Sequence, residues 1–436
     1  MTDTYSAPKG TTDLIGSSAR VWDYCQNVAR EVFERAGYQS IYTPIFEATE
    51  VFTRGIGEAT DVVGKEMYTF PDKAGRSLTL RPENTAGVVR AAINGSLTAN
   101  NTGAKLYYAG PQFRHERPQK GRQRQFYQIG IELLGYDRPQ ADAEVISLLW
   151  DYFIALGLPA QSLTLLINSM GCATCRPAYR ETVRAFICDH TDALCDECVR
   201  RADTNPLRAL DCKNESCRDV LGGAPRLMDA LCPECAAHDR QVRSLLTSIG
   251  ISFAQDDSLV RGLDYYTRTV FEIQTDVGLG AQNALGGGGR YDGLFEALGG
   301  KPTPGIGFAL GFERTALALE AAGIVLREVG DCDIYVACAT EDVRAKAFAL
   351  TNELRDRGWY VQSDLAMRSL KAQMKAADKA QARRVVLLAP DEDSQGGLTL
   401  RDMQTAAERF VAYDDLICEL MDLTDDQSQS KPTQEQ

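Results

Sequence analysis

Two segments of the chain combine side chains that could bind a nucleotide. The first runs Phe113-Arg114-His115-Glu116 and continues, after a polar loop, with Arg122-Gln123-Arg124-Gln125-Phe126. An arginine at the end of a strand offers a planar, bidentate donor to a phosphate, and a second basic residue with an aromatic ring can hold further phosphates and a base. The segment therefore predicts a nucleotide site, although a solvated basic hairpin loop has the same composition.

The second segment is Pro304-Gly305-Ile306-Gly307-Phe308-Ala309-Leu310-Gly311-Phe312-Glu313-Arg314. Its glycines allow close approach to the backbone, and Arg314 stands at the start of an expected helix. A glycine-spaced run is a weak signal alone, and a lone arginine usually forms a surface ion pair. Because it follows the first segment in the chain, it strengthens the prediction of a nucleotide site.

A third group of reactive side chains lies between residues 172 and 235, which hold nine cysteines. Eight of them form close pairs, the usual spacing of tetrahedral zinc sites: Cys172 with Cys175, Cys195 with Cys198, Cys212 with Cys217, and Cys232 with Cys235. Since the only histidines nearby are His190 and His238, any zinc site would be all-cysteine. A small helical module can also bury free thiols as apolar groups, so both alternatives stay open.

The distribution of charge limits which partners the protein can bind. A formal net charge of −13 argues against a protein that coats nucleic acid without specificity, because that binding needs clustered Lys and Arg. Local basic groups nevertheless occur between residues 114 and 124 and in a later row whose three- or four-residue spacing predicts one helical face: Arg368, Lys371, Lys375 and Lys379. Such rows are usually solvated faces, but a tRNA partner stays compatible with them.

Periodicity predicts the elements that position these residues. Ser17 and Ser18 are expected to cap a helix that ends at Gly37, and the strand from Tyr38 to Phe46 should break or lie at an edge because of Pro44. The remaining first-half elements are a long antiparallel hairpin at 105–114 and 125–134, strands at 259–274, 286–289 and 305–311, and a helix at 314–322. Hairpins with helices alongside indicate an α+β fold with a mostly antiparallel sheet.

After Asp331 strands and helices alternate, which predicts a compact α/β domain. Its expected strands are 333–339, 358–362 and 384–389, with one helix ending at Arg357 and another beginning at Arg368. The 436 residues are thus expected to form a large domain at 1–325 with a cysteine-rich helical insert at 171–240, an α/β domain at 331–415 and a disordered tail at 422–436. With a polar N-terminus and no apolar stretch long enough for a bilayer, we expect a cytoplasmic protein without membrane contact.

The two nucleotide-binding segments resemble motifs 2 and 3 of class II aminoacyl-tRNA synthetases, and the helix and strand around Pro44 resemble motif 1, the dimer-forming element of that class. Two more segments, Leu80-Arg81-Pro82-Glu83-Asn84-Thr85 and Leu259-Val260-Arg261-Gly262-Leu263-Asp264-Tyr265-Tyr266-Thr267, resemble the histidine signatures of histidyl-tRNA synthetases. The resemblance extends from Pro8 to about Val411. It implies a class II catalytic domain with a helical insert, a C-terminal α/β anticodon-binding domain, and ATP-dependent ligation of L-histidine to tRNA(His) by a homodimer, with Mg²⁺ accompanying ATP.

The resemblance also implies roles for matching residues. Glu83, Thr85 and Gln128 would face the α-amino group of histidine, while Glu132, Tyr265 and Tyr266 would hold its side chain. ATP would be bound by Arg114 at the α-phosphate, Phe126 at adenine, Arg314 at the distal phosphates, and Glu116. Arg261 would approach the α-phosphate from the amino-acid side and, with Arg114, carry catalysis. The tRNA would meet Arg117, Gln119, Lys120, Arg122 and Arg124 at its acceptor end and Lys371 and Lys375 in the anticodon domain.

One departure and two alternatives qualify the resemblance. Asn84 stands where many family members have glycine, and asparagine tolerates a left-handed conformation better than most residues, so we expect the turn to survive. The first alternative is a catalytically inactive paralogue that regulates an ATP phosphoribosyltransferase in histidine biosynthesis; such paralogues typically lack the C-terminal domain and the arginine that is kept here as Arg261. The second, a ligase for threonine, proline or glycine, disagrees with Glu132 and with the tyrosines at 265 and 266.

Overall fold

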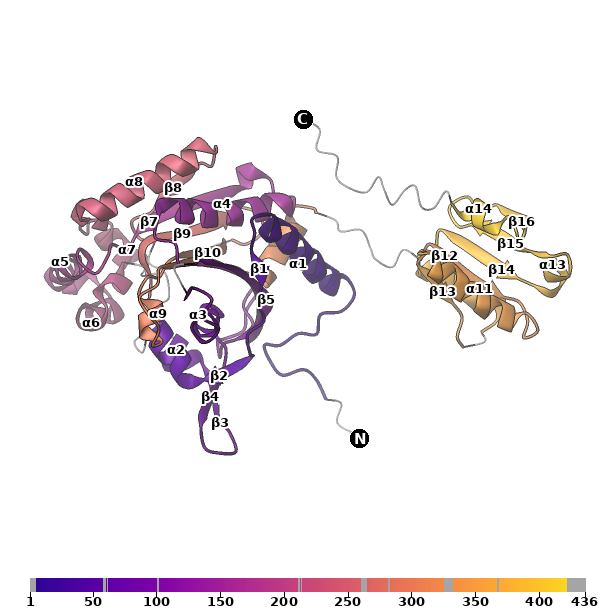
Figure 1. Ribbon diagram of the computed structural model, residues 1–436, viewed down its shortest axis with the longest axis horizontal. Helices are drawn as coiled ribbons and strands as arrows, with labels where there is room; N and C mark the ends of the chain where they lie inside the picture. The colour runs from indigo at the N-terminus through magenta and orange to yellow at the C-terminus, as the bar shows by residue number, and fades with distance from the viewer. Residues whose placement is uncertain are drawn as a thin grey trace. The chain divides into compact units, whose positions relative to one another are not determined.

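The computed structural model describes residues 5–57, 60, 62–99, 102–210, 212, 214–259, 265–280, 283–324, 332–366 and 368–421. The chain divides into two compact units, Met1–Leu326 and Arg327–Gln436, which Figure 1 colours along the sequence. Arg261 and the expected tail at 422–436 lie outside the described residues. Within the described ranges, no helix combines the length and apolar character that a membrane crossing requires.

An eight-stranded sheet organises the first unit. Its strand order is β1-β5-β6-β11-β10-β9-β7-β8. The five inner pairs of neighbouring strands are antiparallel, whereas the edge strand β1 is parallel to β5 and the edge strand β8 is parallel to β7. The strands are β1 (Gln39–Ser40), β5 (Ala104–Phe113), β6 (Gln125–Leu134), β7 (Leu163–Ser169), β8 (Phe253–Gln255), β9 (Thr267–Thr275), β10 (Ala284–Arg290) and β11 (Gly305–Gly311). This arrangement confirms the predicted α+β class with a mostly antiparallel sheet.

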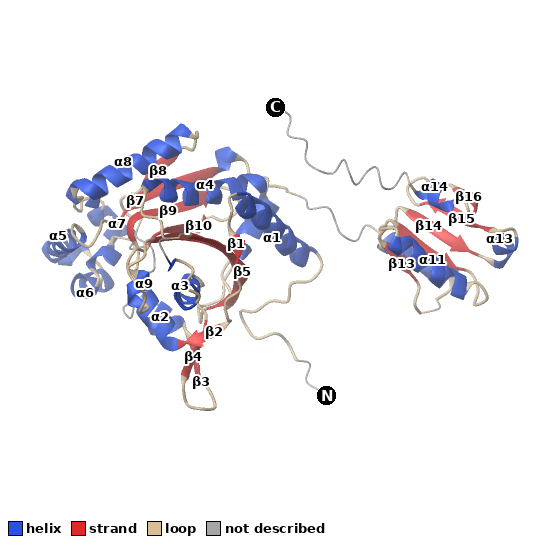
Figure 2. Cartoon of the chain, viewed as in Figure 1, coloured by secondary structure: helices blue, strands red, loops and turns tan. Residues whose placement is uncertain are grey.

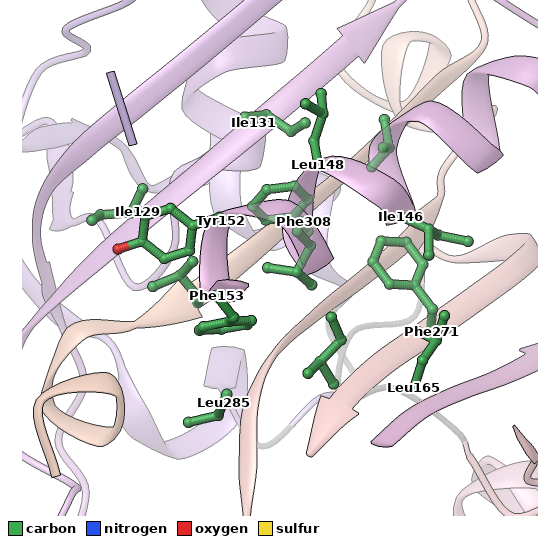
Figure 3. Packing of buried hydrophobic residues seen from close by; sticks show 14 of the residues in the cluster. Ile129, Ile131, Ile146, Leu148, Tyr152, Phe153, Leu165, Phe271, Leu285 and Phe308 are labelled. Carbon is green, nitrogen blue, oxygen red and sulfur yellow. The ribbon is translucent and has the colours of Figure 1, made fainter. Parts of the chain in front are cut away.

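The side chains of β6 alternate between the two faces of the sheet, and the two faces differ in what they contact. Ile129, Ile131 and Leu133 join a large hydrophobic core on one face, and Figure 3 shows the first two beside Tyr152, Phe153 and Phe308. Successive side chains of a strand point to opposite faces, so the even-numbered residues of β6 face away from this core. The core-side helices are α1 (Ser17–Arg35), α4 (Pro139–Ala155), α8 (Pro233–Ser248) and α10 (Phe312–Ala321).

The opposite face of the sheet holds a smaller core around helix α3 (Thr85–Asn94) and α9 (Leu294–Ala297). In Figure 1 the sheet curves around α3. Val88 and Val89 of α3 pack there with Tyr108 of β5, and α2 (Thr49–Ile56) lies against both helices. The start of α3 is therefore held close to the even-numbered side chains of β6.

The N-terminal region corrects the predicted cap of the first helix and confirms the predicted break at Pro44. Helix α1 has Gly16 as its N-cap, and Ser17 and Ser18 lie inside the helix; Ser18 Oγ instead accepts a hydrogen bond from the backbone N–H of Ile15. The expected strand 38–46 is divided at Pro44, because its two ends belong to different sheets. β1 lies at the edge of the large sheet, whereas β2 (Phe46–Ala48) pairs with β4 (Ser77–Leu80), which also pairs with β3 (Tyr68–Pro71).

The expected strand 259–274 is also shorter than predicted, since β9 begins at Thr267, and the expected helix 314–322 begins earlier, at Phe312. The insert contains α5 (Arg176–Asp189), α6 (Asp196–Thr204), α7 (Glu215–Leu221) and short turns, and ends in α8. Figure 2 shows this part of the unit as helices and loops. A buried network fixes α8 to the sheet, because Asp142 of α4 pairs with Arg290 of β10 and accepts a hydrogen bond from His238 of α8.

The second unit is a five-stranded mixed sheet in the order β13-β12-β14-β15-β16, flanked by helices. Its elements are β12 (Ile334–Cys338), α11 (Arg344–Asp356), β13 (Val361–Ser363), α12 (Leu370–Lys379), β14 (Arg384–Leu388), α13 (Pro390–Ser394), β15 (Gly397–Asp402), β16 (Glu408–Ala412) and α14 (Leu416–Leu420). The predicted alternation is present, but Arg368 precedes α12, and its guanidinium pairs with Asp364. Arg368 therefore does not share the helical face of Lys371 and Lys375.

Candidate active site

One pocket of the first unit collects most of the residues that the sequence singled out. Its walls come from the start of α3, the β5–β6 hairpin, strands β10 and β11, and the start of α10. Predicted binding residues in its lining are Glu83, Thr85, Arg114, Glu116, Arg122, Phe126, Gln128, Tyr265, Tyr266 and Arg314. The fold thus brings together side chains that are up to 231 positions apart in the sequence, from Glu83 to Arg314.

Glu83 forms one end of this pocket and also organises helix α3. Its carboxylate accepts hydrogen bonds from the backbone N–H groups of Thr85 (2.7 Å) and Ala86 (2.9 Å), so it caps the helix N-terminus. Burial raises the pKa of Glu83, and the two N–H donors and Arg114 act in the opposite direction. A bound ammonium group would offset the same desolvation, which suits this end of the pocket to a cation.

The turn at Asn84 does not require a left-handed conformation. The φ of Asn84 is −107° and its ψ is −17°, values that any residue adopts, and its side-chain oxygen accepts a hydrogen bond from Thr43 Oγ1 at 2.7 Å. Arg81 in turn donates to the backbone carbonyl of Thr43 at 3.0 Å. The substitution of glycine by Asn84 therefore ties the start of α3 to the segment around Pro44 without backbone strain.

Glu132 is not part of the pocket lining; it is buried on the same side of β6, behind the lining residues Tyr291 and Gly307. Its side chain is only 1% exposed, and burial is the main cause that raises its pKa to about 8. The hydroxyl of Tyr291 donates a hydrogen bond to one carboxylate oxygen. The opposite residue on β11 is Gly307, where any Cβ would lie 2.0 Å from the carboxylate of Glu132, so only glycine leaves room for the acid.

The same face of β6 carries Gln128 and Phe126 at successive even positions. The side-chain oxygen of Gln128 is buried and has no hydrogen-bond partner among the residues that the structure describes, so it is available to a ligand. The guanidinium of Arg114 lies 5.4 Å from the ring centre of Phe126, and its Nε donates to the carbonyl of Pro82 at 2.8 Å. The pocket therefore has the carboxylate of Glu83 at one end, with Glu132 buried behind the lining, and an arginine and an aromatic face at the hairpin mouth.

The first residues of α10 form the wall of the pocket at the end that contains Arg114. Arg314 donates from Nη1 to the carbonyl oxygen of Ala284 at 3.1 Å, which directs its guanidinium toward β10. Glu313 beside it accepts a hydrogen bond from the backbone N–H of Tyr127 at 3.0 Å, and burial raises its pKa to about 7. Glu313 and Tyr291 also line the pocket, and neither was predicted as a binding residue. Glu313 stands within the glycine-spaced segment, which was the available signal.

The predicted tRNA-contacting residues of the hairpin loop fall into two groups. Arg122 forms an ion pair with Glu116 at 3.1 Å, and Arg124 donates to the carbonyl of Glu116 and packs its stem on Gly10. These two arginines are therefore engaged within the first unit. The remaining three predicted contacts, Arg117, Gln119 and Lys120, are exposed.

Two other groups of predicted residues are not part of the pocket lining. Lys371 and Lys375 are exposed on α12 of the second unit. The eight paired cysteines form two clusters in the insert. Tyr265 and Tyr266, by contrast, line the pocket with ring centres 4.6 Å apart, and Tyr265 also contacts Tyr291.

An antiparallel sheet that carries an arginine-bearing hairpin, a glycine-rich strand leading to Arg314, and a separate α/β unit defines a class II aminoacyl-tRNA synthetase with an anticodon-binding domain. Comparisons with known proteins narrow the class. The family model for histidyl-tRNA synthetase matches residues 10–315, and the model for the anticodon binding domain matches residues 333–423.

The chain is 47% identical over 410 residues to the histidine–tRNA ligase of Desulforamulus reducens, covering 94% of this chain and 97% of that protein. It is 48% identical over 406 residues to the histidine–tRNA ligase of Moorella thermoacetica, covering 93% and 95%. The crystal structure of apo histidyl-tRNA synthetase from S. aureus superposes with a TM-score of 0.81 at 35% identity, covering 96% of this chain and 100% of that one.

The chain belongs to the histidyl-tRNA synthetase family. It is an ATP-dependent histidine–tRNA ligase, as the motifs predicted. The regulatory alternative is not favoured: a Bacillus halodurans structure described as an ATP phosphoribosyltransferase regulatory subunit/histidyl-tRNA synthetase is only 22% identical, and that likeness shows the fold alone.

Proposed function

We propose that the pocket holds L-histidine at its carboxylate end and ATP at its arginine end. The observation that carries this proposal is the order of side chains along one face of β6: Glu132 is buried behind the lining residues Tyr291 and Gly307, whereas Gln128 and Phe126 line the pocket toward the hairpin mouth. Histidine carries an ammonium group and an N–H-bearing ring, whereas ATP carries phosphates and a base. The acidic end of the pocket therefore complements histidine, and the end with arginines and an aromatic ring complements ATP.

At the histidine end, Glu83 and Gln128 accept hydrogen bonds from the α-ammonium group, with the Thr85 hydroxyl beside them. Glu132 accepts from an imidazole N–H, which fixes the ring tautomer, while Tyr265 and Tyr266 form the wall. An apolar amino acid of similar size would leave unpaired the second carboxylate oxygen of Glu132, Oε1, which is buried and has no hydrogen-bond partner among the described residues. Rejection of such analogues then needs no separate editing site.

At the ATP end, Phe126 stacks on adenine, Arg114 binds the α-phosphate and Arg314 binds the distal phosphates. A carboxylate oxygen of histidine attacks the α-phosphorus, a P–O bond forms, and the bond to the β-phosphate breaks so that pyrophosphate leaves. Arg114 and Arg261 stabilise the charge that develops on the phosphate oxygens. A terminal ribose hydroxyl of tRNA(His) then attacks the histidyl carbonyl, and AMP leaves.

Mg²⁺ is proposed to enter with ATP. The carboxylates of Glu116 and Glu313 line the arginine end of the pocket and provide the oxygen ligands that Mg²⁺ prefers. Bound there, the ion would neutralise phosphate charge.

The tRNA is proposed to contact two separate surfaces. Arg117, Gln119 and Lys120 of the hairpin loop are exposed and meet the acceptor end, with Arg122 and Arg124 supporting the loop. Lys371 and Lys375 on α12 contact phosphates near the anticodon. Because the tRNA and ATP meet in the cytoplasm, we place the enzyme in that compartment.

A homodimer is proposed through the motif 1 region. Tyr42, Ile45 and Phe46 are large hydrophobic side chains exposed next to the edge strand β1. An exposed apolar group beside an unpaired strand edge marks a protein interface. If this surface joins two copies, a Tyr42→Asp/Ile45→Asp variant sediments as a monomer; an unchanged sedimentation coefficient would contradict it.

The central test is exchange of labelled pyrophosphate into ATP. We expect exchange to require L-histidine and to fall by at least about 100-fold in an Arg261→Ala variant, as expected when a charge-stabilising donor is removed. Arg138→Ala is the matched control, because Arg138 is exposed and its recorded ion pair is with the neighbouring Asp137. No histidine-dependent exchange by the unmodified protein would refute the proposed activity, and equal rates in both variants would refute the role of Arg261.

A further inference from the structure

The paired cysteines of the insert form two separate groups of four. The first, which we call the neck cluster, joins Cys172 and Cys175 to Cys232 and Cys235, 60 residues away. The second, the inner cluster, joins Cys195 and Cys198 to Cys212 and Cys217. Within each cluster all four Sγ atoms lie within 4.8 Å of one another. The chain thus pairs its first and last cysteine pairs, and its two middle pairs, in a nested order.

The sulfur separations match a tetrahedral metal site. In the neck cluster Cys172 Sγ lies 3.7 Å from Cys175 Sγ and 3.8 Å from Cys232 Sγ, and Cys175 Sγ lies 3.9 Å from Cys235 Sγ. In the inner cluster Cys195 Sγ lies 4.0 Å from Cys212 Sγ. Four sulfurs at about 2.3 Å from a central Zn²⁺ are about 3.8 Å apart along each tetrahedral edge. A disulfide would require about 2.0 Å.

The backbone around the sulfurs favours thiolates. Cys175, Cys195 and Cys232 are the N-cap residues of α5, α6 and α8, where the helix dipole favours negative charge. Backbone N–H groups also point at sulfur: Cys172 N–H at Cys175 Sγ (3.2 Å), Thr174 N–H at Cys172 Sγ (3.3 Å) and Cys195 N–H at Cys217 Sγ (3.1 Å). Such donors are the usual outer partners of metal-bound ligands.

Burial of free thiols as apolar groups explains this arrangement less well. A thiol that is buried only as an apolar group can pack against any apolar side chain, so hydrophobic packing does not favour groups of four thiols. In each cluster, moreover, two of the four cysteines are only partly buried. Cys188, the ninth cysteine of the insert, is exposed and belongs to neither cluster. We therefore propose that the insert binds two Zn²⁺ ions, one at the neck cluster and one at the inner cluster, each held by four cysteine thiolates whose protons are released to solvent.

The neck ion has a further consequence, which rests on the proposed role of Tyr266. Arg176, the residue after Cys175, donates from Nη1 to the backbone carbonyl of Tyr266 at 2.9 Å. Backbone hydrogen bonds also join Met170 and Gly171 to Arg268, at 2.6 and 2.8 Å. The loop that supplies two ligands of the neck site therefore holds the segment that carries the pocket tyrosines.

The first experiment counts zinc in full-length, tag-free protein purified without chelators. We expect two zinc ions per chain in the unmodified protein, one in Cys175→Ser, one in Cys198→Ser and none in the double variant. Cys188→Ser is the matched control and should keep two. Substoichiometric zinc in the unmodified protein, or equal zinc in all variants, would overturn the proposal.

A second measurement does not depend on the variants folding. A mercurial added to the unmodified protein should release two equivalents of zinc to a coloured chelator. Protein prepared with Co²⁺ should show the intense visible bands of a tetrahedral tetrathiolate site. Eight thiols that react at once without metal release, or weak octahedral Co²⁺ bands, would contradict the two sites.

Pyrophosphate exchange then tests the coupling to the pocket. We expect Cys175→Ser to raise KM for histidine by about fivefold, the effect of weakening one supporting hydrogen bond, while Cys198→Ser stays within about twofold. Equal KM values with the expected zinc contents would overturn the coupling and leave the zinc sites supported. Absence of exchange in the unmodified, zinc-loaded protein would instead contradict the proposed function.

Discussion

Replacement of Glu132 by glutamine should make the ligand-free protein more stable and the enzyme less active. The carboxylate of Glu132 is buried under the pocket, and its pKa of about 8 arises first from burial and is raised further by Glu83, while the hydroxyls of Tyr291 and Thr85 act in the opposite direction. Glutamine keeps the shape and an oxygen that accepts from Tyr291. It removes the charge that the folded state has to accommodate.

The size of the stability effect follows from the two pKa values. The pKa of this acid is near 4.5 in the unfolded chain and about 8 in the folded protein. Its contribution to the free energy of unfolding is therefore fully present below pH 4.5 and is lost as the pH rises to about 8. The whole difference corresponds to about 5 kcal/mol. Glu132→Gln lacks this loss, so its stability advantage over the unmodified protein should grow by about 3 kcal/mol between about pH 6 and about pH 9.

The activity should change in the other direction. A charged acceptor for the imidazole N–H contributes roughly 2 to 3 kcal/mol, so kcat/KM for histidine should fall about 30- to 150-fold while KM for ATP stays within about twofold. Pyrophosphate exchange measures both constants. Unfolding is followed by tryptophan fluorescence in a Trp359→Phe background, because Trp22 and Trp150 then report on the first unit alone.

Glu313→Gln is the matched control for this prediction. Glu313 is also buried, with a pKa raised to about 7, but it lies at the ATP end of the pocket and accepts from Tyr127. It should gain stability at high pH and leave KM for histidine unchanged. The reasoning would be refuted if the stability advantage of Glu132→Gln did not increase with pH, or if its kcat/KM for histidine equalled that of the unmodified protein.

Three further substitutions test other parts of the molecule. Phe126→Ala should raise KM for ATP in pyrophosphate exchange by about tenfold, because base stacking contributes roughly 1 to 3 kcal/mol, and should leave KM for histidine within about twofold. Lys371→Glu/Lys375→Glu should raise KM for tRNA in aminoacylation by about tenfold while exchange is unchanged, since neither lysine is among the residues that line the pocket. Gly307→Ala should lower the free energy of unfolding by about 3 kcal/mol in urea titration, because its Cβ would lie 2.0 Å from Glu132, whereas Gly311→Ala on the same strand meets open space and should cost less than about 1 kcal/mol.

Local patterns predicted the two strands of the hairpin well. The strands at 105–114 and 125–134 appear as β5 and β6 within one residue, because alternating apolar side chains specify a strand with one buried face. The resemblance to a family then identified side chains such as Gln128 that nothing in composition marks. At Arg368 the helical spacing was misleading, because this residue precedes the helix and pairs with Asp364 in the segment before it.

Tyr291 shows why part of the pocket was beyond reach of the sequence. It is 159 positions from Glu132, and its hydroxyl meets that carboxylate only because β10, β11 and β6 are neighbours in the sheet. No spacing rule connects the two residues, and a tyrosine after a glycine-rich strand is ordinary core sequence. The partner of a buried acid is therefore predictable only after the strand order is known.

The insert illustrates the same limit for ligand pairing. Four close cysteine pairs identified eight candidate ligands, but their spacing is equally compatible with sites built from neighbouring pairs. The nested pairing follows from where the chain leaves and re-enters the catalytic sheet: β7 ends at Ser169 and α8 begins at Pro233, with the buried contact of His238 and Asp142 anchoring α8 to the sheet. The two ends of the insert must then lie together, so Cys172 meets Cys232, and the inner pairs have only each other.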